Sequence, residues 1–163
     1  MTSCLLIVDV QKGFMNEHTQ HVPARVEQLQ AGYDVVYATR FYNANPSFYR
    51  TLIGWHRLSR DSDDFMLAFR LKDSARVIDK SIYTCVDKLF ISELSGQGIE
   101  TVDICGVDTD ICVTKCAVDL FECNIEPRVL ADHCASHAGT SAHEHALRTL
   151  ERFIGKKQVM GWS

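Results

Sequence analysis

The chain has 163 residues, 46% of them hydrophobic and 23% charged, which is the composition of an ordinary soluble globular domain. A formal net charge of −4, with Lys156-Lys157 as the longest basic cluster, argues against a nucleic-acid-binding surface. No apolar run approaches the roughly 18–20 residues that span a bilayer. We therefore expect one domain over residues 1–163 that binds neither nucleic acid nor membrane.

The seven cysteines are odd in number and scattered along the chain. The apolar start, MTSCLLIVDV, lacks the basic segment of a secretion signal and reaches an aspartate after five apolar or cysteine residues. Reduced thiols and a cytoplasmic location are the interpretation that fits both observations.

The N-terminal half alternates short apolar runs with less apolar segments. It begins with a predicted strand, and near-continuous apolar runs of this kind are typical of parallel strands buried on both faces. Pro23 and Gly32 bound a short helix. Segment 43–75 is less regular, and we expect it to form a lid or a substrate wall. In chain order, the predicted elements are a strand at 4–8, a helix at 24–31, a strand at 34–39, a helix around 46–58 and a strand at 76–79.

The C-terminal half continues the alternation with stronger helical periodicity. Its predicted elements are a helix at 87–96, a strand at 101–106, a helix at 110–123, a strand at 127–131, a helix at 139–154 and a short strand at 158–160. Alternating strands and helices imply right-handed crossovers and helices on both faces of the sheet. The expected fold is a three-layer α/β/α sandwich with a mainly parallel sheet of about six strands.

Ligands of such sheets bind at the carboxyl ends of the strands, which directs attention to the residues after each run. Asp9 closes the first strand, Lys80 the third, and Cys112 stands where the helix after the fourth begins. A helix N-terminus and a lysine both favour a thiolate, and an aspartate can exchange its proton. Taken singly, Cys112 could equally be an inert core cysteine, Lys80 a surface lysine and Asp9 half of an ion pair.

The segments LLIVDVQKGF, VVYATRF, DKSIYTCV and GVDTDICVTKCAVDLFECNIEPRVLADHCAS resemble the isochorismatase-like cysteine hydrolases, which include nicotinamidases and N-carbamoylsarcosine amidases. The shared motifs are D-x-Q, K-x-x-Y and G-V-x-T-D-x-C-V, spread from Leu5 to about Ser136. The resemblance implies an Asp9–Lys80–Cys112 catalytic triad. It also implies cleavage of a C–N bond in a small amide, ureide or carbamoyl compound through a thioester.

Further features follow from the same resemblance. The Val107–Asp108 peptide bond is expected to be cis, and the N–H groups of Asp108 and Cys112 to form an oxyanion hole. Phe14 and Tyr83 match positions that line the site in the family. Arg40, by its place near a strand end, is predicted either to bind a substrate carboxylate or to pair with an acidic side chain. Phe41 and Tyr42 are further candidates for the pocket wall.

The chain departs from nicotinamidases in its metal ligands. The region after the second strand, TRFYNANPSFYRTLIGWH, has no D-x-H and only one histidine, His56. We therefore predict no metal and no cofactor. A zinc site built on Cys112 and Cys116 with Cys123, His133 or Cys134 lacks the usual paired spacing. His143 and His145 are expected to be solvent-exposed.

Two other functions remain open at this stage. A reactive Cys112 would also suit a thiol redox protein, and the same fold could serve as a non-catalytic binding domain. Members of the family that the chain resembles are usually dimers or tetramers, so we expect a homo-oligomer acting on a small molecule.

Overall fold

Six parallel strands form one sheet in the order β3-β2-β1-β4-β5-β6. The computed structural model describes residues 1–162. The chain runs from β1 outward through β2 to β3, returns through α3 to β4 on the other side of β1, and then continues outward to β5 and β6. The strands are β1 (Cys4–Val8), β2 (Val35–Phe41), β3 (Arg76–Lys80), β4 (Thr101–Val107), β5 (Glu126–Ala135) and β6 (Val159–Met160).

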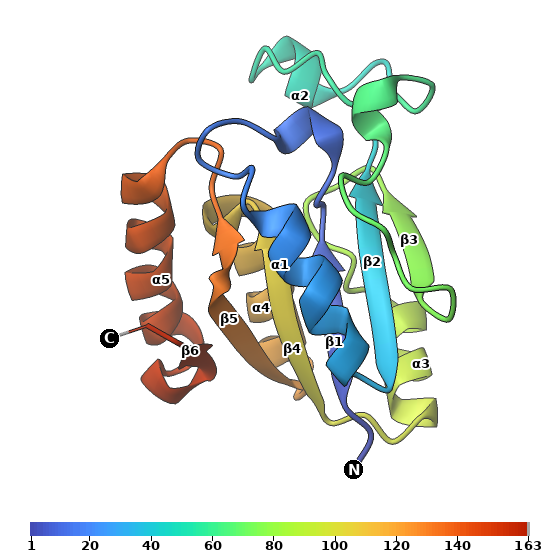
Figure 1. Ribbon diagram of the computed structural model, residues 1–163, viewed down its shortest axis with the longest axis vertical. Coiled ribbons are helices and arrows are strands. Elements are labelled where there is room, and N and C mark those ends of the chain that lie inside the picture. The colour runs from blue at the N-terminus through green and yellow to red at the C-terminus, as the bar shows by residue number, and fades with distance from the viewer. Residues whose placement is uncertain (163) are drawn as a thin grey trace.

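The helices cover both faces of this sheet. Figure 1 shows α1 in front of the strands and α3 and α4 behind them, while α5 packs against α4 at the β5–β6 side. This division follows from right-handed crossovers, because the chain leaves β1 in one direction and β4 in the other. The helices are α1 (Val22–Leu29), α2 (Phe48–Thr51), α3 (Lys88–Gly96), α4 (Thr114–Glu122) and α5 (Thr140–Ile154). The predicted three-layer fold is confirmed.

The core is centred on β1, whose five residues are all buried. A strand with helices on both faces has no solvent side, which explains its unbroken apolar sequence. A buried polar residue, Gln11, follows it. The Gln11 amide donates to the carbonyls of Phe41 and Phe65 and accepts the N–H of Phe41, so it joins three segments above the sheet.

Segment 43–75 differs most from the prediction. The helix expected around 46–58 is a single turn, α2, because Gly54 adopts a positive φ of 74° and the Trp55 N–H returns to the carbonyl of Tyr49. Arg50 ties the segments before and after α2 together by donating to the carbonyls of Asn43 and Ala44 and to Ser59 Oγ. Side-chain hydrogen bonds, rather than helical ones, order this segment.

The strand predicted at 127–131 is also longer than expected. β5 continues to Ala135, and its register against β4 shifts between Ile104 and Gly106. The shift lets the strand pass Asp132 and His133 while still pairing, so the loop at its carboxyl end begins at Ser136. Because β5 ends at Ala135, the histidine that reaches the site described below is His137.

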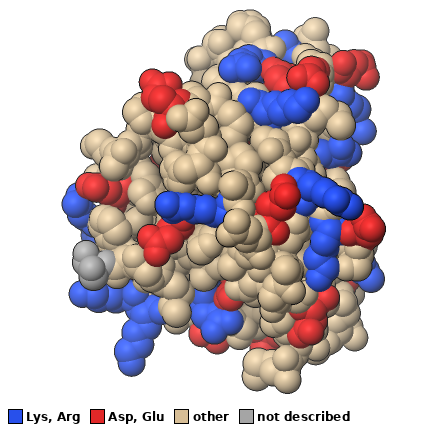
Figure 2. All heavy atoms as spheres, in the orientation of Figure 1, with Lys and Arg blue, Asp and Glu red and all other residues tan. Residues whose placement is uncertain are grey.

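The surface carries charges of both signs. Figure 2 shows Lys and Arg side chains interspersed with Asp and Glu on the face it presents. Within residues 1–162, no helix has the length and apolar character needed to cross a membrane.

Candidate active site

The carboxyl ends of three strands bring Asp9, Lys80 and Cys112 together. Lys80 Nζ lies 2.7 Å from Asp9 Oδ2 and 3.7 Å from Cys112 Sγ. Asp9 follows β1, Lys80 ends β3, and Cys112 lies in the helical turn after β4. The three residues are far apart in the sequence, and the parallel sheet places them side by side.

Asp9 is fully buried and its carboxylate is held from two sides. Thr39 Oγ1 donates to Asp9 Oδ1 at 2.6 Å and accepts the Asp9 N–H at 3.1 Å, while Lys80 binds Oδ2. The residue also has a positive φ of 49°, an uncommon backbone conformation for a residue other than glycine. A buried carboxylate persists only when it is paired and hydrogen-bonded, and here both conditions are met.

Lys80 is buried, with all three ammonium protons directed to partners. Besides Asp9 and Cys112, it donates to the carbonyl of Ile82 at 3.1 Å. Burial by itself would lower the pKa of Lys80, but the nearby Asp9 carboxylate and Cys112 sulfur outweigh it and raise that pKa above the ordinary value. Lys80 is therefore a fixed positive charge between the carboxylate and the thiol.

Cys112 is 6% exposed. Burial raises the pKa of its thiol well above the ordinary value, Asp9 raises it further, and Lys80 acts in the opposite direction. The resting side chain is accordingly a protonated thiol. A nucleophilic role then requires a base that takes the proton as the sulfur attacks, and Asp9 is the carboxylate placed to do so.

The turn between β4 and α4 shapes the backbone around Cys112. Its Val107–Asp108 peptide bond is cis, and residues Thr109–Val113 form a π-helical turn with Asp108 as its N-cap. Gly106, with a φ of 119°, lies so close to β1 that a Cβ atom would fall 2.1 Å from the Val8 carbonyl oxygen. Only glycine fits this approach.

A cavity of about 180 Å³ opens onto Cys112. Drug-sized ligands occupy pockets of roughly 300–1,000 Å³, so this cavity suits a smaller molecule. Its walls are mostly aromatic and aliphatic, and segment 43–59 supplies three of them, which agrees with the substrate wall expected there. The lining residues are Phe14, Phe41, Tyr49, Ile53, Trp55, Tyr83, Asp108, Ile111, Cys112 and His137.

Asp108 and His137 are hydrogen-bonded to each other in the cavity wall. The Asp108 carboxylate accepts the backbone N–H of His137 at 3.0 Å through Oδ1 and contacts His137 Nδ1 through Oδ2. The hydrogen bond to Asp108 raises the pKa of His137 above its ordinary value, against the opposing effect of burial. This pair was not anticipated from the sequence.

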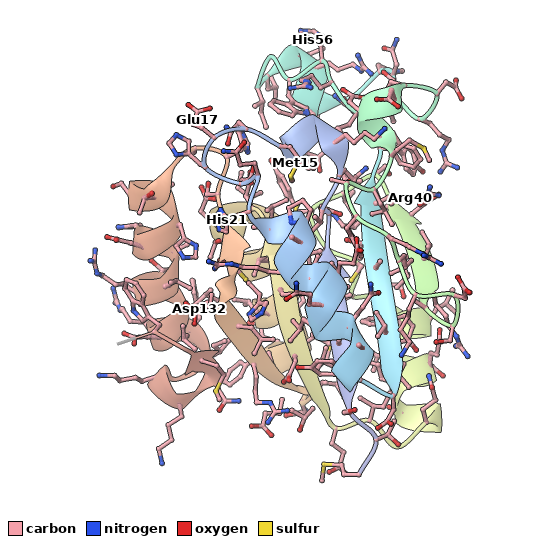
Figure 3. The ribbon with its side chains drawn as sticks, viewed as in Figure 1. Met15, Glu17, His21, Arg40, His56 and Asp132 are labelled. Carbon is pink, nitrogen blue, oxygen red and sulfur yellow. The ribbon has the colours of Figure 1, made fainter. Side chains whose placement is uncertain are left out.

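The predicted substrate-binding residues divide into two groups. Phe14 and Tyr83 line the cavity, as does Phe41. Arg40 does not: it stands opposite Asp79 in the β2–β3 register and donates to both carboxylate oxygens at 2.8 and 3.0 Å. Figure 3 shows Arg40 beside the upper part of β2. Of the two roles predicted for Arg40, the structure shows the ion pair with an acidic side chain. Tyr42 lies under Arg60 rather than in the cavity wall.

No trio of His, Cys, Asp or Glu side chains within residues 1–162 is close enough to hold a metal ion. Asp9 is occupied by Lys80 and Thr39, and His56 lies exposed on the loop after α2 (Figure 3). The residues present therefore do not fit a metal site next to Cys112. Cys116 lies 3.9 Å from Cys85, sulfur to sulfur, in the core.

His143 corrects another expectation. It is half-buried, and its Nδ1 lies 2.7 Å from Thr109 Oγ1, so it supports the turn that carries Cys112. His145 is exposed as expected.

The parallel sheet with acid, lysine and thiol at its carboxyl edge defines the isochorismatase-like class of α/β fold. The family model described as Isochorismatase domain matches residues 3–158, and the chain belongs to this family. A search of curated proteins found no match.

Solved structures share the fold at low sequence identity. A pyrazinamidase/nicotinamidase from Streptococcus mutans UA159 is 20% identical with a TM-score of 0.83, covering 94% of this chain and 98% of its own. The pyrazinamidase of Pyrococcus horikoshii, in complex with zinc, is 21% identical with a TM-score of 0.79, covering 94% and 97%. A cysteine hydrolase from Pseudomonas syringae pv. phaseolicola 1448A is 18% identical with a TM-score of 0.81, covering 94% and 86%.

Proposed function

We propose that this protein is a cysteine-dependent hydrolase that cleaves a C–N bond of a small amide, ureide or carbamoyl compound. The observation that carries the proposal is the buried chain of contacts from Asp9 through Lys80 to Cys112, which ends at the floor of a small cavity. Membership of the isochorismatase family and the hydrolase names of the structural neighbours support it.

In the first half of the proposed reaction, the Cys112 thiol transfers its proton to Asp9 and the sulfur attacks the substrate carbonyl. The N–H groups of Asp108 and Cys112 receive the oxyanion, a form of stabilisation whose loss typically costs about 10²–10³ in rate. Lys80 keeps the total charge of the buried group near neutral. When the C–N bond breaks, Asp9 returns the proton to the leaving nitrogen, and the acyl group stays on Cys112 as a thioester.

In the second half, water attacks the thioester with Asp9 again accepting a proton. The products are the carboxylic or carbamic acid and the free thiol. Every step uses residues of this chain and a water molecule, and no step calls for a cofactor.

One observation weighs against a redox role for Cys112, and another against a non-catalytic binding domain. Oxidation-sensing thiols have a low pKa and are accessible, whereas Cys112 is buried and its pKa is raised. A buried lysine–carboxylate pair behind the thiol is also costly to maintain for a binding domain that performs no chemistry.

The test is a screen of small amides, ureides and carbamoyl amino acids, read by ammonia release. We expect at least one class to be hydrolysed by the wild-type protein and Cys112→Ala to reduce turnover by several orders of magnitude while leaving the folded state intact. Cys116→Ala is the matched control, because Cys116 is a buried cysteine one helical turn away that does not line the cavity. Full turnover by the Cys112→Ala protein would rule out the mechanism.

A further inference from the structure

Cys85 and Cys116 are neighbouring thiols in the core that the proposed reaction does not use. Both are free, their sulfur atoms lie 3.9 Å apart, and the two residues are 5% and 0% exposed. A disulfide joins two sulfurs at about 2.05 Å, so these sulfurs have to approach each other by about 2 Å to form one. The pair is therefore within reach of a bond after a local adjustment.

One of the two cysteines lies in a segment that can make this adjustment. Cys116 is in the first turn of α4, where the helix fixes its backbone. Cys85 lies in residues 81–87, which connect β3 to α3 without forming a helix or a strand. Irregular connections move more readily than the elements that they join. The approach is thus expected to come mainly from Cys85.

The surroundings of the pair favour a negative charge on Cys116. Its sulfur accepts hydrogen bonds from the side chain and the backbone N–H of Cys85, and the Lys80 ammonium acts in the same direction. These contacts hold the pKa of Cys116 below its ordinary value against the effect of burial. The side-chain hydrogen bond, together with burial, raises the pKa of Cys85. Cys116 is therefore the thiolate of the pair, and Cys85 is the thiol that can react with it after oxidation.

We infer that Cys85 and Cys116 form a reversible disulfide when the protein meets a hydroperoxide, and that this bond slows turnover at Cys112. The formation of the bond is independent of the proposed function, whereas its effect on turnover rests on that function. The pair is a modification site separate from the catalytic cysteine, because oxidation leaves the Cys112 thiol free.

The oxidation takes place in two steps. The Cys116 thiolate attacks one oxygen of the peroxide, the O–O bond breaks, and the departing hydroxide takes the proton of Cys85 and leaves as water. Cys116 is then a sulfenic acid. The Cys85 thiolate attacks the Cys116 sulfur, the S–S bond forms, and the S–O bond breaks. This second hydroxide takes up the proton that Cys116 lost on ionising. Two thiols have lost two electrons, and hydrogen peroxide has become two water molecules.

The segment that holds Cys85 also shapes the active site. The Ile82 carbonyl accepts a hydrogen bond from Lys80 Nζ at 3.1 Å, and Tyr83 lines the cavity with its ring 5.2 Å from that of Tyr49. A movement of Cys85 toward α4 displaces these neighbours in the same segment. Because a misplacement of about 1 Å near catalytic groups can cost about 100-fold in rate, we expect the oxidised protein to turn over about 10- to 100-fold more slowly.

The probe is hydrogen peroxide, added to the Cys123→Ser protein so that the exposed cysteine cannot join two molecules. Remaining thiols are alkylated under denaturing conditions, and peptide mass mapping should then find Cys85 joined to Cys116 with Cys112 alkylated. Dithiothreitol should separate the joined peptides. Cys105→Ala, which removes a buried cysteine of β4 outside the pair, is the matched control and should leave the bond unchanged. Free Cys85 and Cys116 after treatment, or a bond from either one to Cys112, would overturn the inference.

Turnover of the best amide from the screen is measured on the same samples. The oxidised protein should show the stated loss and regain its rate with dithiothreitol. Cys85→Ala and Cys116→Ala are made separately, so that one remains informative if the other does not fold. Each should keep the rate of the reduced protein and lose the reversible response to peroxide. Unchanged turnover in the disulfide-bonded protein, or a reversible loss that persists in the variants, would overturn the effect on turnover.

Mass mapping needs no substrate, so its result is independent of the proposed function. If the bond forms in a protein that hydrolyses none of the amides, the disulfide stands and the hydrolase proposal fails. If the reduced protein hydrolyses an amide and no bond forms, the hydrolase proposal stands and the disulfide fails.

Discussion

Lys80 is the residue on which the charge balance of the site depends. Its three donors contact a carboxylate, a carbonyl and a thiol, and it remains protonated in spite of its burial. Since Asp9 already has a counterion and Cys112 has a raised thiol pKa, the resting site holds one buried ion pair and one neutral thiol. When the Cys112 sulfur attacks a substrate carbonyl, the negative charge that develops on the sulfur lies beside the Lys80 ammonium.

Replacing Lys80 tests this balance through stability. Lys80→Met leaves the Asp9 carboxylate buried without its cation, and removing one partner of a buried pair costs about 3–5 kcal/mol. Denaturant unfolding should show a loss of that order. Lys115→Met is the control, because the Lys115 side chain that pairs with Asp119 is exposed. Exposed ion pairs contribute roughly 0–1 kcal/mol to the free energy of unfolding. Equal losses in the two variants would contradict the account.

The raised thiol pKa of Cys112 has its own consequence. Only the thiolate is alkylated, so the iodoacetamide reaction of Cys112 in the free protein should be slow at neutral pH and continue to accelerate above about pH 8.5, the ordinary thiol value. Peptide mass mapping after timed quenching measures this, with the exposed Cys123 as an internal reference. A plateau for Cys112 below pH 7 would show a preformed thiolate.

Among the elements, the strand ends decided which site residues could be predicted. Asp9 follows the buried run CLLIV, and Lys80 follows the short strand predicted at 76–79, so both residues could be placed at the sheet edge from the sequence. β5 runs on past Ala131 through a register shift, which no periodicity reveals, and so His137 rather than Asp132 or His133 reaches the cavity. β2 also runs to Phe41, which leaves Arg40 within the strand, opposite Asp79.

The wall formed by segment 43–59 was predictable only in outline. Its low periodicity indicated an irregular structure near the site, but Tyr49, Ile53 and Trp55 reach the cavity because of a single-turn helix and the contacts of Arg50. These are tertiary hydrogen bonds between residues that carry no motif. The sequence therefore indicated where the wall lies and not which side chains form it.

The close approach of β4 to β1 can be tested at Gly106. Gly106→Ala would place a Cβ against the Val8 carbonyl in a backbone conformation that alanine rarely adopts, so we expect a loss of about 2 kcal/mol or more in the free energy of unfolding. Gly96→Ala is the matched control, because that glycine ends α3 with open space around it. Its unfolding free energy should stay level or rise by up to about 1 kcal/mol. Comparable losses in both would refute the close approach.

At the scale of the whole molecule, the strand order follows from general rules of α/β folds. Right-handed crossovers and buried parallel strands account for the sheet, and the strand-end rule accounts for the site at its carboxyl edge. Oligomeric state has no comparable rule, because it depends on surface shape. Phe48, Leu52 and Ile53, on and after α2, are between 62% and 76% exposed, which is unusual for neighbouring large apolar side chains.

We expect the protein to form a homo-oligomer, a dimer or a tetramer, in solution. Light scattering coupled to gel filtration measures its mass directly. If α2 contributes to the contact between subunits, Leu52→Lys should shift the population toward the monomer. Leu89→Lys is the control, because Leu89 is a similarly exposed leucine on α3, and it should leave the population unchanged. A wild-type monomer at micromolar concentration would contradict this expectation.

In the proposed mechanism, Cys112 carries the acyl group of the substrate during turnover. Acid quenching during hydrolysis of the best amide from the screen, followed by mass spectrometry of the Cys112 peptide, tests it most directly. We expect an acyl adduct on Cys112 that disappears as substrate is exhausted and is absent from the Cys112→Ala protein. Steady hydrolysis with no adduct on Cys112, and with undiminished turnover in Cys112→Ala, would contradict it.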